Sequence, residues 1–208
     1  AEGLQTTTKK TLESIGKVEV RLAVIDRAQA NIADLSGQVV NLQNILSNKQ
    51  ARGAFGEIQL NDLVRQVLPP SAYHFQAPLE NGKRVDCLLE LPNPPGAIAI
   101  DAKFPLESYH ALQAATDGVA RKTAERAFRA AMQGHIKDIS ERYIVAGETA
   151  DAALMFLPSE AVYAELHANF PAVVDASYQA RVFIVSPTTL WATLNTVRAI
   201  LKDVRMKE

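Results

Sequence analysis

Residues 97–103 read Ala97-Ile98-Ala99-Ile100-Asp101-Ala102-Lys103, an apolar run that ends in a charged pair. Four apolar residues in succession favour a strand that is covered on both faces, as at the centre of a sheet. Residues two apart on a strand share a face, so Asp101 and Lys103 are expected to point the same way. A carboxylate and an ammonium buried there must be paired, hydrogen-bonded or bound to a metal. The stretch predicts a central strand with a polar site at its end.

The segments around this strand predict an α/β body. Strands are expected over 73–79 and 84–91, joined at Asn81-Gly82, which is a strong signal of a tight hairpin. Two later strands are expected over 152–157 and 181–185. Helices are expected over 57–68, 106–115, 119–145, 160–170 and 172–178, and from 187 to the end. This order predicts a mixed central sheet flanked by helices on both sides.

The first 50 residues have a different character. From 11 to 46 there is no proline, and apolar residues recur at steps of three and four. This spacing predicts a long coiled-coil helix, which we expect to self-associate rather than fold back onto the body. We therefore expect a helical arm over 1–50 and a nuclease-like α/β domain over 51–208. Because the chain ends inside a helical pattern, that domain is expected to be truncated at its carboxyl terminus.

Composition narrows the classes of function. The net charge of −1 excludes a bulk polycation, so any contact with nucleic acid must use a local basic patch. The single cysteine, Cys87, excludes a disulfide framework and a cysteine-clustered zinc site. The chain has no Gly-rich phosphate loop ending in Gly-Lys-Ser or Gly-Lys-Thr, no His-Glu-x-x-His and no nucleophile elbow. No apolar stretch is long enough to cross a bilayer, so this chain is expected to make no membrane contact.

Two further carboxylates can join the pair at the strand end. On the strand before it, Val85, Cys87 and Leu89 are expected to share one face, with Asp86 on the other. Glu57 heads an apolar stripe on its helix and is therefore expected to look inward. Gly53 and Gly56 precede it, and their lack of side chains would allow a close approach to another backbone.

Three acids and one lysine in one place indicate a Mg²⁺-dependent phosphodiesterase. Hard divalent cations prefer oxygen ligands, and Mg²⁺ or Mn²⁺ would be held by Asp86 and Asp101, with Glu57 and the Ala102 carbonyl assisting. Lys103 would position the attacking water or neutralise the phosphate. Asp-x-Lys at a strand end also occurs as a purely structural ion pair, so a structural protein with a buried charge cluster stays an alternative.

Several ordered blocks of the sequence resemble the RmuC family of bacterial DNA recombination proteins. They are Arg52-Gly53-Ala54-Phe55-Gly56-Glu57, Val85-Asp86, Asp101-Ala102-Lys103-Phe104-Pro105-Leu106-Glu107, Phe156-Leu157-Pro158-Ser159-Glu160 and Ser186-Pro187-Thr188-Thr189-Leu190. That family is regarded as a branch of the PD-(D/E)xK nucleases, so the resemblance implies a restriction-endonuclease-like core. It also implies Asp86 and Asp101 as metal-binding acids, Lys103 as the catalytic lysine and Glu57 as the helical acid. The departure is Val85, which stands where the motif has proline.

The resemblance implies a metal-dependent nuclease acting on recombination intermediates or aberrant DNA. The alternative is a non-catalytic, oligomeric DNA-binding or scaffold protein that keeps the nuclease fold. We expect a cytoplasmic location, while family members typically carry an amino-terminal membrane anchor that is not among these residues.

Basic side chains on the helix expected over 119–145 form the candidate DNA-binding patch. Its proposed members are Arg121, Lys122, Arg126, Arg129, His135 and Lys137. Lysine and arginine contacts to phosphate give affinity without sequence preference. A solvated helix face explains the same charges, and His135 also fits a core position on the stripe of Phe128, Met132 and Ile139.

Overall fold

The body of the chain is built on one five-stranded sheet, seen here in a computed structural model that describes residues 48–205. The strands are β1 (Tyr73–Pro78), β2 (Arg84–Leu89), β3 (Ala97–Ala102), β4 (Thr149–Phe156) and β5 (Val182–Val185), and they lie in that order. β1, β2 and β3 pair antiparallel, whereas β3, β4 and β5 pair parallel. The sheet is therefore mixed and β3 is its central strand, as the apolar run predicted.

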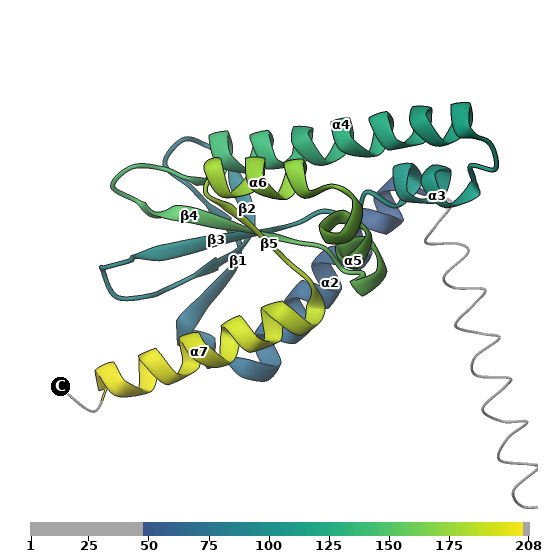
Figure 1. Ribbon diagram of the computed structural model, residues 1–208. Coiled ribbons are helices and arrows are strands. Elements are labelled where there is room, and N and C mark those ends of the chain that lie inside the picture. The colour runs from purple at the N-terminus through teal and green to yellow at the C-terminus, as the bar shows by residue number, and fades with distance from the viewer. Residues whose placement is uncertain (1–47, 206–208) are drawn as a thin grey trace, which may run out of the picture. The chain divides into compact units, whose positions relative to one another are not determined.

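Helices cover both faces of the sheet. They are α2 (Lys49–Val67), α3 (Leu106–Ala114), α4 (Gly118–Tyr143), α5 (Glu160–Asn169), α6 (Pro171–Gln179) and α7 (Pro187–Arg205), with a short 3₁₀ turn at Pro70–Ala72. Figure 1 shows α4 and α6 on one side of the sheet and α2 and α7 on the other. The expected α/β architecture is confirmed. The coiled-coil arm predicted over 11–46 lies outside the described residues, and the boundary at residue 51 stays a prediction.

Alternate residues of the central strands enter two separate cores. Ala99 and Met155 belong to the core under α4, α5 and α6, whereas Ile100 and Phe156 belong to the core under α2 and α7. All four side chains are fully buried. Because both faces of β3 are covered, its continuous apolar sequence is explained, and a charged side chain at its end is exposed to little water.

Local sequence signals account for most helix ends. α2 begins earlier than expected because the Asn48 side chain accepts a hydrogen bond from the Gln50 N–H at 2.9 Å and so caps the helix. Its residues 52–56 are therefore helical. α2 ends before the Pro69-Pro70 pair, as expected. Ser159, which directly precedes α5, caps that helix by accepting a hydrogen bond from the Val162 N–H. Among the described helices, none is both long and apolar enough to span a bilayer.

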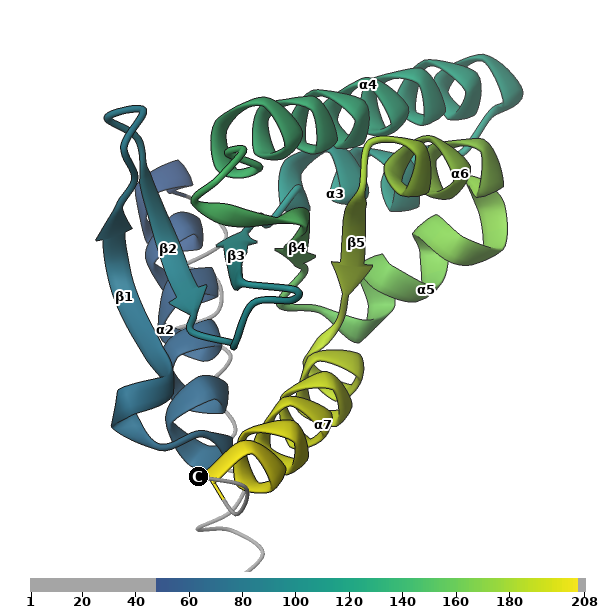
Figure 2. The same cartoon turned by 90° about the vertical axis from the view of Figure 1, so that its left-hand side faces the viewer.

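The β1–β2 hairpin lies at one edge of the sheet (Figure 2). The face that this hairpin buries changes halfway along its length. Phe75 and Cys87, which face each other, pack into the core under α2 and α7, whereas Ala77 and Val85 pack into the opposite core. The prediction that Val85 shares a face with Cys87 is therefore wrong. The reason is Gln76, whose φ of 50° interrupts the two-residue alternation of β1, and β2 follows because the pairing register is kept.

Gly56 lies where α2 packs closely against the end of β3. A Cβ at this position would be 3.4 Å from the Cβ of Ala102 and 3.6 Å from Cγ of Pro158, so a methyl group fits and a larger side chain does not. The expected close approach is thus confirmed for Gly56. It is wrong for Gly53, which has nothing within 4 Å of such an added Cβ.

We expect Gly56→Leu to lower the free energy of unfolding by about 1–3 kcal/mol, because the added side chain must displace Ala102 or Pro158. Gly134→Ala on α4 is the matched control: nothing lies within 4 Å of an added Cβ there, so the helix should gain about 0.5–1 kcal/mol. Urea unfolding followed by circular dichroism measures both. Unchanged or increased stability in Gly56→Leu would contradict this account of α2 packing.

Candidate active site

A cavity of about 800 Å³ opens beside the carboxyl end of β3, between α2, α3 and α4. Its lining includes six of the residues singled out from the sequence, namely Glu57, Asp86, Asp101, Ala102, Lys103 and His135. They come from four elements and from the segment that follows β3, and they span 79 positions of the chain, from 57 to 135. The structure therefore brings the three predicted acids and the predicted lysine to one cavity.

Asp101 and Lys103 form an ion pair, as their shared strand face predicted. Lys103 Nζ lies 2.5 Å from Asp101 Oδ2, and the two side chains are 26% and 3% exposed. Among the described residues, this oxygen has the ion pair but accepts no hydrogen bond. A buried carboxylate oxygen with a single partner keeps a lone pair available for a cation.

Asp86 lies where the pairing between β2 and β3 ends. Their ladder ends at the pair Cys87 and Ile100, and beyond it Asp86 Oδ2 accepts a hydrogen bond from the Ala102 N–H at 2.9 Å. Burial, followed by the negative charge of Asp101, raises the pKa of Asp86 to about 7, and Glu57 adds to the rise although the bond from Ala102 opposes it. The acids therefore repel one another in a poorly hydrated space. A bound cation would reduce this repulsion.

Gln76 connects two of these acids. Its Nε2 lies 3.0 Å from Glu57 Oε2 and 3.3 Å from Asp86 Oδ1. No sequence pattern indicates this contact, because it depends on a left-handed backbone at Gln76 that the residue type does not indicate.

Two residues of α4 complete the wall of the cavity. Burial, then the Lys103 ammonium, lowers the pKa of His135, so its imidazole is neutral at pH 7. Burial, followed by the negative charge of Asp101, raises the pKa of Tyr143 well above its usual value. Sequence reasoning did not identify Tyr143. The spacing did indicate it, because Tyr143 follows His135 by eight residues. That is close to two helical turns, so both side chains are expected on the same face of the helix.

Lys49 and Arg52 add positive charge to the lining of the cavity from the first turn of α2. Arg52 lies 3.5 Å from Glu107, whose side chain is 89% exposed. Neither basic residue was selected from the sequence as part of the site. The sequence did indicate a role for Arg52 at the site, because Arg52 is the first residue of the motif that contains Glu57 on the same helix.

The basic patch predicted on α4 lies away from the cavity, apart from His135. The face of α4 that lines the cavity carries Ala127, Ala131, His135 and Asp138. The other proposed members, Arg121, Lys122, Arg126, Arg129 and Lys137, do not line it. Their contact with DNA stays a prediction.

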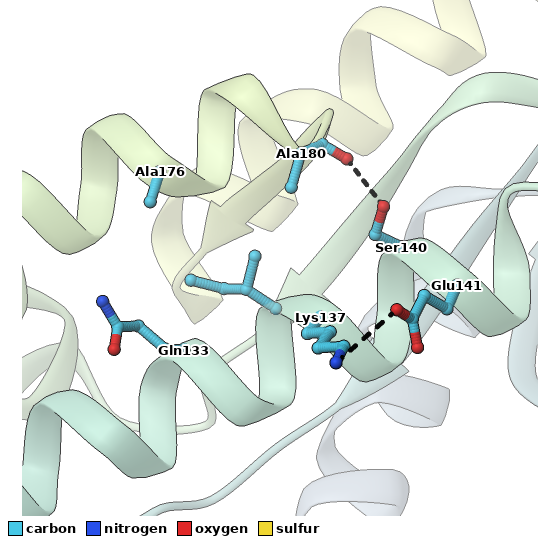
Figure 3. A pocket seen from close by; sticks show the side chains of 7 residues that line it. Gln133, Lys137, Ser140, Glu141, Ala176 and Ala180 are labelled. Carbon is cyan, nitrogen blue, oxygen red and sulfur yellow. Dashed lines mark hydrogen bonds and ion pairs between the residues drawn. The ribbon is translucent and has the colours of Figure 1, made fainter.

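Several of these basic side chains already have partners. Arg121 pairs with Glu125 and Glu165. Figure 3 shows a smaller hollow between α4 and α6, where Lys137 pairs with Glu141 at 3.9 Å and Ser140 donates to the Ala180 carbonyl. These contacts give the helix face a structural role that does not require DNA.

The residues fit a hard cation held by two carboxylates. Within residues 48–205, no group of three or more His, Cys, Asp and Glu side chains lies together in a metal-binding arrangement. Mg²⁺ usually takes only one or two protein carboxylates and completes its shell with water and phosphate oxygens. Asp86 and Asp101, with the free lone pair of Asp101 Oδ2, offer such a set. Glu57 is tied to Gln76, and its place among the ligands stays a prediction.

Comparison with known proteins identifies the family of this chain. A model of the RmuC family matches residues 1–208. The chain belongs to the RmuC family. This confirms the resemblance carried by the motif blocks, and several of the residues in those blocks line the cavity.

Individual relatives agree with this assignment. A protein of Xylella fastidiosa named DNA recombination protein RmuC homolog is 32% identical over 219 residues, covering 100% of this chain and 48% of the relative. The Pseudomonas aeruginosa homolog is 26% identical over 88% of this chain and 42% of its own length. DNA recombination protein RmuC of Escherichia coli K12 is 25% identical over 94% and 44%. The chain spans about half the length of these RmuC relatives, and no solved structure matches it.

The raised pKa of Asp86 leads to a prediction about stability. With an ordinary value of 3.8 when unfolded and about 7 when folded, Asp86 favours the folded state at low pH. This contribution is fully present below pH 3.8 and is lost as the pH rises through 7. With a chelator present, we expect Asp86→Asn to be more stable than the unsubstituted protein at pH 8, by about 1–3 kcal/mol, and to show little gain at pH 4.

Urea unfolding at the two pH values checks this expectation. Asp175→Asn is the control, because Asp175 is an exposed acid on α6 that does not line the cavity. An equal gain at both pH values would contradict the assignment of the effect to buried charge.

Proposed function

We propose that this chain carries the catalytic body of a metal-dependent deoxyribonuclease that acts on DNA during recombination. The observation that carries the proposal is the meeting of Asp86, Asp101 and Lys103 in one cavity at the end of the central strand. The names of the relatives, DNA recombination protein RmuC, support the process. A mixed sheet whose central strand ends in Asp-x-Lys is the arrangement that a restriction-endonuclease-like core requires, so we propose that fold as well.

Asp86 and Asp101 would hold Mg²⁺ or Mn²⁺, assisted by Glu57 and the carbonyl of Ala102. Such a cation, when bound, polarises the phosphodiester and lowers the pKa of a coordinated water. The protein keeps Asp86 fixed through the bond from the Ala102 N–H and limits its access to solvent. A carboxylate that is already oriented loses little freedom when it binds a ligand.

Lys103 would act directly on the substrate. Its ammonium pairs with Asp101 and is about a quarter exposed toward the cavity, so it can reach a phosphate oxygen or the attacking water. A positive charge in a poorly hydrated cavity stabilises developing negative charge more strongly than it would in water. The neutral imidazole of His135 lines the same cavity from α4 and can donate a hydrogen bond to the substrate or accept one from it.

Cleavage of DNA tests the proposal. We expect metal-dependent nicking of supercoiled DNA or degradation of linear DNA, and a decrease in rate of about 10²–10³-fold in Lys103→Ala, because charge stabilisation at the phosphate is lost. Asp101→Asn should weaken Mn²⁺ binding as well as cleavage. Lys202→Ala, which removes an exposed lysine of α7 outside the cavity, is the control and should retain full activity.

The assay should use this chain and a full-length RmuC relative with the corresponding substitutions, since the chain spans about half of such a relative. Binding of DNA without cleavage in either metal would favour the non-catalytic scaffold instead. Absence of both DNA binding and Mn²⁺ binding would favour a structural charge cluster.

The dependence of DNA affinity on salt tests which surface contacts phosphate. We expect Lys49→Ala to reduce the slope of log affinity against log salt by about 0.9, the value for one lost phosphate contact with duplex DNA. Arg126→Ala tests the patch predicted on α4 in the same way. An equal decrease there would support contact with α4, and an unchanged slope would remove that face from the interface.

A further inference from the structure

Gln76 adopts an unfavourable backbone conformation inside a strand. Within residues 48–205, two non-glycine residues have a positive φ, Gln76 at 50° and Arg181 at 59°. Arg181 lies in the turn before β5, where such angles are common. Gln76 lies in the middle of β1, where a left-handed residue without local advantage is rare, and strained residues of this kind gather at functional sites.

The side chain of Gln76 gives a reason for this conformation. Its amide nitrogen lies 3.0 Å from Glu57 Oε2 and 3.3 Å from Asp86 Oδ1, and its two hydrogens can serve both acids at once. A carboxylate accepts but does not donate hydrogen bonds, so the amide nitrogen, not the oxygen, must face the two acids. One side chain on β1 thus joins an acid of α2 to an acid of β2.

We propose that Gln76 is a positioning residue of the metal site, which sets the separation and orientation of Glu57 and Asp86 before a cation binds. The inference rests on the proposed metal-dependent function. Asp86 is then fixed at both oxygens, with Oδ2 bonded to the Ala102 N–H and Oδ1 bonded to Gln76. Each oxygen has a second lone pair, so this fixation leaves room for a ligand bond.

The other explanation is that Gln76 only ties the hairpin to α2. A structural tie would change stability when removed but would leave cation affinity alone. A residue that orients metal-binding carboxylates typically changes metal affinity by 10–100-fold when it is replaced. The two explanations therefore differ in the affinity for Mn²⁺, which can be measured without DNA.

Gln76→Gly is the variant of choice, because glycine adopts a positive φ freely and the protein should fold while the amide is lost. We expect its dissociation constant for Mn²⁺, measured by calorimetry, to rise 10–100-fold. Arg181→Gly is the matched control: it removes the other left-handed side chain, outside the cavity, and should leave Mn²⁺ affinity within twofold. Gln76→Asn keeps an amide and tolerates a positive φ, but it is one methylene shorter and should lose affinity as Gln76→Gly does.

A second measurement needs no metal. The side-chain NH₂ signals of Gln76 in a ¹⁵N-labelled protein, assigned by their loss in Gln76→Gly, should shift in Glu57→Gln and in Asp86→Asn. They should not shift in Glu107→Gln, which changes an exposed acid of the same cavity that is not bonded to Gln76.

Unchanged Mn²⁺ affinity in Gln76→Gly would overturn the inference while the proposed function stood. If the unsubstituted protein bound no Mn²⁺, the inference would fall together with the metal-dependent part of the proposed function, and shifted NH₂ signals would identify Gln76 as a structural tie. A protein that bound Mn²⁺ but did not cleave DNA would contradict the proposed function alone, and the role of Gln76 would still be decided by the dissociation constants.

Discussion

The constraint on which this structure depends is the placement of two acids, the buried Asp101 and the half-buried Asp86, at one end of the central strand. The ammonium of Lys103 pairs with Asp101, whereas burial, followed by the negative charge of Asp101, raises the pKa of Asp86. Burial of like charges opposes folding, so the rest of the body must supply enough apolar packing to outweigh it. The two cores on either side of the sheet supply this packing.

The mixed topology of the sheet makes this convergence possible. β2 runs antiparallel to β3, so the start of β2 lies beside the end of β3, and Asp86 near the first comes next to Asp101 near the second. On the other side, β4 runs parallel and continues the ladder as far as Lys103, whose N–H donates to the Phe156 carbonyl. β3 is thus held firmly by β4 while it separates from β2. The cavity opens on the side where that pairing ends.

The sequence was sufficient for features that depend on short-range patterns. Asp101 and Lys103 share a face because alternation holds along a continuous strand, and Ser159 caps α5 because its position before the helix favours that bond. It was not sufficient where one residue breaks a pattern. The left-handed backbone at Gln76 moved Val85 to the opposite core and created the link between two acids, and no residue type in β1 signals it. Such angles follow from tertiary packing rather than local preference.

The basic side chains of α4 differ from Lys49 of α2 in their surroundings. A helix that packs one face against a sheet and a second face beside a cavity leaves a third face in water, and basic residues are common on such a face whatever the function. Lys137 and Arg121 pair with acids of their own helix, which satisfies their charge locally. Lys49 differs because it lines the cavity from the first turn of α2, as the acids do from their own elements. A phosphate bound at Lys103 would lie in a cavity that Lys49 lines, whereas Arg121 and Lys137 do not line it.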